Sequence, residues 1–79
     1  MITDIELGPE DVRAARAFLQ WSQGDLARKA GVGISTIAEF EKGSRTPIAN
    51  NLAAIRRALE AAGVRFTSAG PTIFSEVSL

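Results

Sequence analysis

The side chains best suited to chemistry are hydrogen-bonding and charged groups between residues 34 and 45. Ser35, Glu39 and Lys42 recur at spacings of four and three residues, which places them on one face of a helix. A serine hydroxyl donates or accepts a hydrogen bond, a glutamate carboxylate accepts, and a lysine ammonium group donates. This face therefore suits non-covalent recognition of a polar surface.

Catalysis is poorly supported by the residue inventory. The chain has no His and no Cys, so the usual general base, nucleophilic thiol and metal ligands are missing. Gly31-Val32-Gly33 begins like a dinucleotide-binding motif, but Thr36 stands at the third glycine position and no strand precedes it. We therefore expect a protein that is not an enzyme and that holds no cofactor and no metal ion.

Two short helices joined by a glycine-bounded turn are predicted between residues 22 and 43. Ser22 is a good N-cap for the first helix, and Asp25 approximates the acidic half of a capping box. Gly31 can end that helix in the left-handed conformation, and Gly43 ends the second. Two helices across a short turn that contains glycine describe a helix-turn-helix.

One helix is predicted before this motif and one after it. Pro9 at the first helical position, followed by acidic residues, starts a helix that runs to about Leu19. Pro47 stops the second motif helix. A stripe of apolar residues then predicts a last helix over residues 49–62, with Gly63 as its stop.

The motif resembles the helix-turn-helix of the phage-repressor-like, Xre-type transcriptional regulators. The residues that carry the resemblance are Trp21-Ser22-Gln23, Leu26-Ala27, Ala30-Gly31-Val32, Ser35-Thr36-Ile37, Glu41, Gly43 and Arg45-Thr46-Pro47. The likeness extends from Val12 to about Gly63. It implies a mostly α fold with four helices. The fifth helix that the family often has is replaced here by a short C-terminal β extension.

These patterns divide the chain into three parts. We expect an N-terminal arm over residues 1–8, a helix-turn-helix DNA-binding domain over residues 9–63 and a β extension over residues 64–79. Residues 64–67 and 72–79 alternate apolar with polar groups around turn chemistry at residues 68–71.

The resemblance also implies base contacts. In that family the first, second and sixth positions of the second motif helix commonly reach base edges, here Ile34, Ser35 and Glu39. Ala38 lies on the same predicted face. Ser35 can bond several bases, Ile34 could meet a thymine methyl group, and Glu39 could accept from cytosine N4. The family often has a polar residue where Ile34 stands, so no base preference is predicted.

Four residues are candidates for contacts with phosphates. Gln23 matches the family position that anchors the DNA backbone. Lys42 and Arg45 follow the second motif helix closely, and Thr36 is either a phosphate contact or a helix-start residue. Each phosphate that is neutralised should steepen the salt dependence of binding.

An ion pair between Arg16 and Glu41 is implied by the same resemblance. The matching Arg of the family commonly pairs with the acidic residue near the end of the recognition helix. The alternative is that Arg16 is a solvated surface residue.

The overall charge does not itself indicate DNA binding. Nine basic and nine acidic residues cancel, and the pI is about 6.2, whereas DNA-binding domains often have a pI above ~9. Four acidic residues lie within the first twelve, so residues 13–79 carry a net charge of +4. Acidic and basic surfaces can therefore be separated.

The β extension needs a partner, because an isolated two-stranded hairpin is marginal in water. It could pack on the domain, pair with a second copy or dock on another protein, and we favour pairing between two copies. The candidate interface residues are Val64, Phe66, Ile73, Phe74 and Val77.

Together these features predict a cytoplasmic, sequence-specific double-stranded DNA-binding regulator. We expect a repressor that binds a near-palindromic operator as a homodimer. No membrane partner is expected, since no apolar run approaches the length of a membrane span. Two alternatives stay open: an antitoxin-type regulator whose tail binds a toxin protein, and a protein-interaction module of the same fold without DNA affinity.

Overall fold

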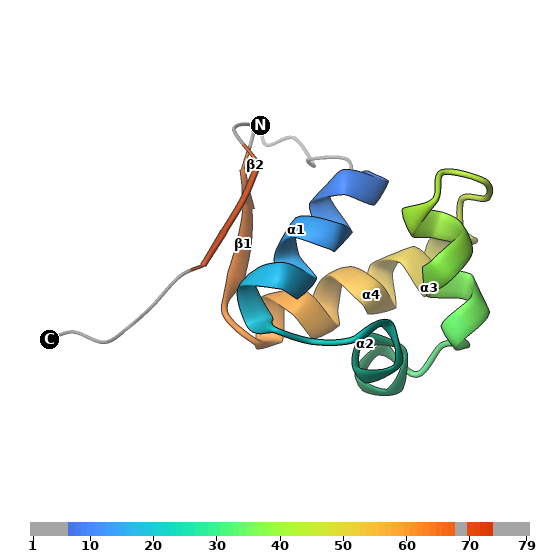
Figure 1. The fold of residues 1–79 in the computed structure, drawn as a ribbon, viewed down its shortest axis with the longest axis horizontal. Coiled ribbons are helices and arrows are strands. Elements are labelled where there is room, and N and C mark those ends of the chain that lie inside the picture. The colour runs from blue at the N-terminus through green and yellow to red at the C-terminus, as the bar shows by residue number, and fades with distance from the viewer. Residues whose placement is uncertain (1–6, 68–69, 74–79) are drawn as a thin grey trace, which may run out of the picture.

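The computed structural model describes residues 7–67 and 70–73. Four helices are followed by an antiparallel hairpin of two short strands (Figure 1). The elements are α1 (Pro9–Leu19), α2 (Gln23–Ala30), α3 (Ile34–Glu41), α4 (Ala49–Ala61), β1 (Val64–Thr67) and β2 (Gly70–Ile73). The mostly α fold with a C-terminal β extension is confirmed. No helix in the described part is long and apolar enough to cross a membrane.

Local capping chemistry sets the helix ends. At the start of α2 the Ser22 hydroxyl accepts from the Asp25 N–H, and the Asp25 carboxylate accepts from the Ser22 N–H, both at 2.9 Å. Gly31 follows α2 at φ 72°, a backbone conformation that favours glycine. In α1 the Asp11 carboxylate accepts from the Gly8 N–H at 2.9 Å, and Pro9 occupies the first helical position.

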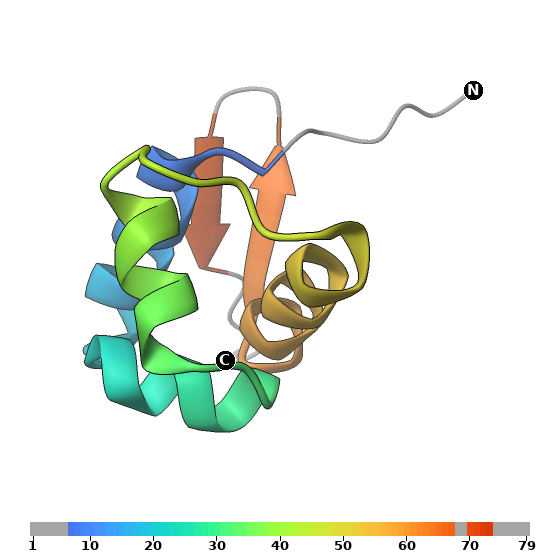
Figure 2. The same cartoon turned by 90° about the vertical axis from the view of Figure 1, so that its right-hand side faces the viewer.

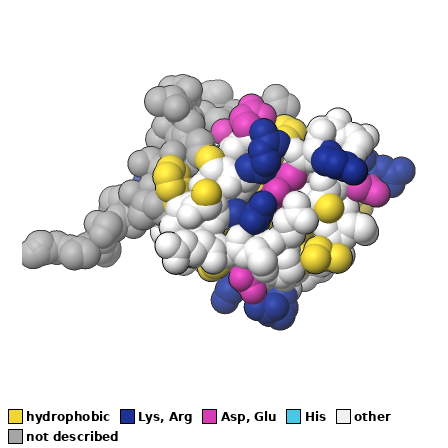
Figure 3. Space-filling view, viewed as in Figure 1, with side chains coloured by type: hydrophobic (Ala, Val, Ile, Leu, Met, Phe, Trp, Pro, Cys, Tyr) yellow, Lys and Arg dark blue, Asp and Glu magenta, His cyan; other side chains and the backbone are white. Residues whose placement is uncertain are grey.

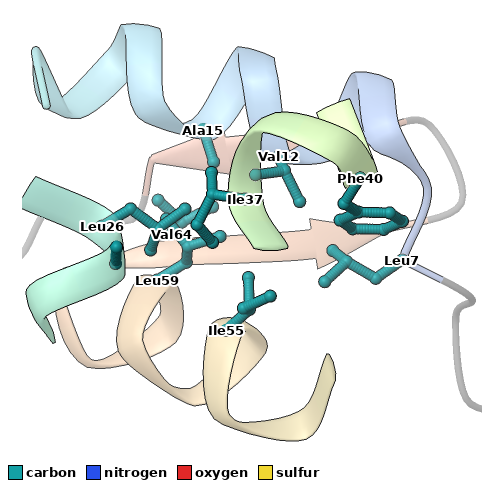
Figure 4. Close-up of a cluster of buried hydrophobic side chains, with 10 residues drawn as sticks. Leu7, Val12, Ala15, Leu26, Ile37, Phe40, Ile55, Leu59 and Val64 are labelled. Atoms are coloured by element: carbon teal, nitrogen blue, oxygen red, sulfur yellow. The ribbon is translucent and has the colours of Figure 1, made fainter. Parts of the chain in front are cut away.

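All four helices and the hairpin share one apolar core (Figure 4). Its buried members are Leu7, Val12, Ala15, Leu26, Ala27, Ile37, Phe40, Ile55, Leu59 and Val64. Trp21 and Val32 pack against this cluster from the links between helices. Leu7, near the end of the predicted N-terminal arm, is 7% exposed and belongs to this core. Residues 1–6 of that arm lie outside the described residues.

The hairpin packs on the helical domain. β1 lies against α4 and β2 lies against α1, so the extension covers the end of the domain away from α3 (Figures 1 and 2). In the register of the pair, Val64 lies opposite Ile73 and Phe66 opposite Pro71. Gly70 and Pro71, which the sequence placed in the turn, are strand residues. A proline is tolerated there because β2 is an edge strand.

Two expected interface residues have partners within the chain. Val64 is 1% exposed and belongs to the domain's own core, so its assignment to a partner interface is wrong. Phe66 is half-buried against the core, and the Arg56 guanidinium lies over its ring at 5.8 Å from the centroid. Ile73 is in β2, whereas the expectations for Phe74 and Val77 fall outside the described residues.

Candidate functional site

The two motif helices, α2 and α3, pack against each other across the turn at residues 31–33. Val32 anchors this turn, since its N–H donates to the Ala27 carbonyl at 3.0 Å and its side chain contacts the core. Ile37 and Phe40 bury the inner side of α3. The opposite side of α3 therefore faces outward.

The outward side of α3 begins with two exposed residues. Ile34 is 56% exposed and Ser35 is also exposed, while Ala38 and Glu39 are half-buried further along the helix. A β-carbon placed on Gly24 would lie 3.6 Å from Ile34 Cδ1, which is ordinary van der Waals contact. The N-terminal ends of α2 and α3 thus meet at one place on the surface.

A groove runs beside α3, between that helix and the segment that leads into α4. It is lined by Ser35, Thr36, Glu39, Arg45, Thr46, Pro47, Ile48 and Asn51. Four of the residues singled out in the sequence therefore line one hollow. Ile48 and Asn51 were not predicted as site residues, and Thr46 was noted only as part of the family resemblance. Ile48 lies in the irregular segment before α4, which leaves no periodic signal, whereas Asn51 lies in the first turn of α4.

Positive charge flanks this groove. Lys42 and Arg45 are both exposed, at the C-terminal end of α3 and in the segment after it. Figure 3 shows Lys and Arg side chains over this part of the molecule, at the upper right. The face thus offers hydrogen-bonding and apolar groups on the helix, with cations beside them that could meet phosphates.

Behind this face, Arg16 and Glu41 are brought together. The Arg16 Nε atom lies 2.6 Å from Glu41 Oε2, and Arg16 Nη2 donates to Glu41 Oε1 at 2.8 Å. Arg16 Nη1 also donates to the Trp21 carbonyl at 2.8 Å. One guanidinium therefore joins α1, the link before α2 and the end of α3.

Gln23 is part of the same cluster. It is half-buried at the first position of α2, and its Nε2 atom donates to Glu41 Oε1 at 3.1 Å. Arg13 Nη1 donates to the Glu41 carbonyl. Arg13 was not predicted as a site residue, although its spacing of three from Arg16 places both on one face of α1. The contact suits a helix C-terminus, where positive charge is favourable.

Electrostatics keep the Glu41 carboxylate ionised. Burial alone would raise its pKa, but hydrogen bonds from Arg16 and Gln23, with the charges of Arg16 and Arg13, hold the pKa below its ordinary value. The hydrogen bond to Glu41 raises the pKa of Arg16 despite partial burial. The pair is therefore charged across the physiological range.

The described residues offer no alternative metal chemistry. Within residues 7–67 and 70–73, no three His, Cys, Asp or Glu side chains gather into a site that could hold a metal ion.

Comparisons with known proteins match this geometry. A family model described as a helix-turn-helix domain matches residues 10–65. The DNA-binding domain of the P22 c2 repressor is 31% identical over 73% of this chain and 76% of that chain, with a TM-score of 0.63. A search of curated protein sequences gave no match.

A second similar protein is the restriction-modification controller protein C.Esp1396I. Its wild-type structure is 27% identical over 66% of this chain and 67% of that chain, with a TM-score of 0.61. The structure of a single-residue mutant of the same protein is also 27% identical to this chain, with a TM-score of 0.62. The match covers 66% of each chain, so this chain spans just under two thirds of the length of that protein.

Proposed function

The chain belongs to the helix-turn-helix family, and from this premise we propose that it is a sequence-specific double-stranded DNA-binding repressor that acts as a homodimer. In such motifs the second helix enters the major groove by its N-terminal end, while the first crosses the phosphate backbone. Here those helices are α3 and α2. The P22 c2 repressor domain, similar in fold and sequence, supports the DNA-binding and repressor parts of this proposal.

One observation carries the proposal: Ile34, a large apolar residue, is 56% exposed at the first position of α3, beside exposed Ser35 and a groove that Arg45 lines. The major groove presents thymine methyl groups, and an exposed isoleucine at this position can contact them. We assign base contacts to Ile34, Ser35, Ala38 and Glu39.

The remaining candidates contact the backbone. Gln23, Thr36, Lys42 and Arg45 are assigned to phosphates. Glu39 repels phosphates, so it acts mainly by excluding sequences that lack a cytosine amino group at its position. Phosphate contacts fix the position of the protein on the duplex, and base contacts select the sequence.

Size and geometry support repression as a homodimer. One small domain makes few contacts, and a two-fold axis would place two α3 helices about one DNA turn (~34 Å) apart on a near-palindromic site. Occupancy of a site is sufficient to block transcription. The outer edge of β2 is the surface we assign to pairing between copies.

The test is fluorescence anisotropy of labelled duplexes that cover the DNA upstream of the protein's own gene, with a shuffled duplex as control, at two salt concentrations. We expect preferential binding that weakens with salt, and a reduced preference in Ser35→Ala with the fold intact. Sedimentation with and without duplex measures the stoichiometry. Failure to enrich any sequence in a random-site selection would overturn the proposal.

A further inference from the structure

The contact between Gln23 and Glu41 joins a surface position to a buried one. The Glu41 side chain is 4% exposed, so DNA cannot reach it. Gln23 is half-buried at the first turn of α2, where the adjoining Gly24 meets Ile34 of α3. Its amide therefore lies between the buried carboxylate and the edge of the proposed DNA-binding face.

The chemistry of the two groups dictates which way the amide is turned. A carboxylate only accepts hydrogen bonds, so Glu41 Oε1 selects the NH2 end of the Gln23 amide, 3.1 Å away. That NH2 group has two hydrogens, and the second points away from Glu41. Without the carboxylate, the amide could equally turn its carbonyl oxygen outward, which would repel a phosphate.

The surrounding charges make this arrangement compatible with an anion. Arg16 holds Glu41 through two hydrogen bonds, and Arg13 donates to the carbonyl of the same residue. Two guanidinium groups therefore contact Glu41, and the charges of both favour its ionised carboxylate. The cluster behind Gln23 carries a net positive charge despite Glu41.

We propose that Glu41 is a positioning residue for DNA binding: it holds the Gln23 amide so that the second N–H donates to a backbone phosphate. This proposal rests on the DNA-binding function proposed above. It gives Glu41 a role beyond the ion pair with Arg16, because the same carboxylate oxygen, Oε1, accepts from both residues.

The experiment replaces one phosphate at a time with a neutral methylphosphonate in a selected operator duplex. Equilibrium binding is measured for the wild type, Gln23→Ala, Glu41→Met and the control Arg16→Lys, which keeps both the carboxylate and a cation. Circular dichroism and thermal melting check that each variant is folded. If Glu41→Met does not fold, the double variant Arg16→Met with Glu41→Met removes the carboxylate without leaving an unpaired buried charge.

In the wild type, we expect one modified phosphate in each half-site to weaken binding about tenfold through loss of a charge-assisted hydrogen bond that Gln23 makes. That effect should fall below about twofold in Gln23→Ala and in the variants without the carboxylate, and it should persist in Arg16→Lys. The other phosphates should keep their effects in every variant.

Two results would overturn the proposal while leaving DNA binding intact. In the first, the phosphate-specific effect persists without the Glu41 carboxylate, which would make Glu41 purely structural. In the second, no phosphate effect depends on Gln23. A wild type that binds no duplex preferentially would instead remove the proposed function, and this inference with it.

Discussion

Arg16 and Glu41, 25 positions apart in the sequence, meet side by side: Nε lies 2.6 Å from Oε2, and Nη2 lies 2.8 Å from Oε1. This fork of two parallel hydrogen bonds is a strong and geometrically specific form of ion pair. The Glu41 side chain is 4% exposed and that of Arg16 is 20% exposed. Water therefore screens the pair only weakly.

Removing only one member of the Arg16–Glu41 ion pair should strongly destabilise the fold. Glu41→Ala leaves a partly buried guanidinium without its partner, so we expect the free energy of unfolding to fall by about 3–5 kcal/mol. The double variant Arg16→Met with Glu41→Leu should recover most of this loss. Urea unfolding followed by the fluorescence of Trp21, the single tryptophan, measures both. A loss below about 1 kcal/mol in Glu41→Ala would indicate an ordinary surface pair.

Stability should fall at acid pH through Glu41. Its pKa is lower in the folded chain than its ordinary value of 4.5. The ionised form therefore contributes stability that is present above about pH 4.5 and is lost as the pH falls through the lower, folded pKa. Asp25 acts in the same direction, because hydrogen bonds from the Ser22 backbone and from Arg28 lower its pKa.

Urea midpoints between pH 7 and pH 2.5 test this dependence. Glu41→Gln should be less stable than the wild type at pH 7, and the two curves should converge in acid because protonation then removes the same charge from the wild type. Glu39→Gln, a carboxylate change on the same helix, is the matched control. If the urea midpoints of the wild type and Glu41→Gln changed in parallel with pH, the acid dependence could not be assigned to Glu41.

Two glycines, Gly24 within α2 and Gly31 at the C-terminal cap of that helix, should respond in opposite directions to alanine. Gly31 has φ 72°, so Gly31→Ala should destabilise the fold by about 1 kcal/mol through backbone strain alone, since nothing lies within 4 Å of the added carbon. Gly24 is helical and has room for a β-carbon 3.6 Å from Ile34 Cδ1. Gly24→Ala should therefore stabilise it by up to about 0.5 kcal/mol. Thermal melting of both variants decides this, and equal effects would contradict it.

Base and phosphate contacts should separate in binding experiments. Arg45→Ala should weaken binding to all duplexes alike and reduce the slope of log K against log salt by about 0.9. Ser35→Ala should instead reduce the preference for the selected operator over a mismatched one and leave the slope unchanged. Salt titrations on both duplexes measure the two quantities. A slope change in Ser35→Ala would place that residue on the backbone.

Features of the fold that depend only on residues close together in the sequence were predictable. Pro9 and the Ser22–Asp25 capping box mark helix starts through chemistry confined to one turn, and the observed starts of α1 and α2 agree with them. Alternation along residues 64–67 predicted a strand for the same reason. The alternation does not show what covers the strand, so Val64 was assigned to a partner interface although it lies in the core.

The candidate site was less accessible to sequence reasoning. Helical periodicity identified the outward residues of α3, because Ile37 and Phe40 fix the inner side. The bond between Gln23 and Glu41 joins residues 18 positions apart on different helices, and no period or spacing marks it. The Arg13 contact with the Glu41 carbonyl depends in the same way on how α1 and α3 pack.

The core also determines how much of the chain must be kept to obtain a domain that folds autonomously. Leu7 precedes α1, lies at the same end of the cluster as Phe40 (Figure 4) and is 7% exposed. A fragment trimmed to residues 10–65, the span of the family match, would retain α3 with its outward side chains. It would lose a buried leucine, whose removal typically costs about 2–5 kcal/mol. The autonomous folding unit is therefore larger than the recognisable motif.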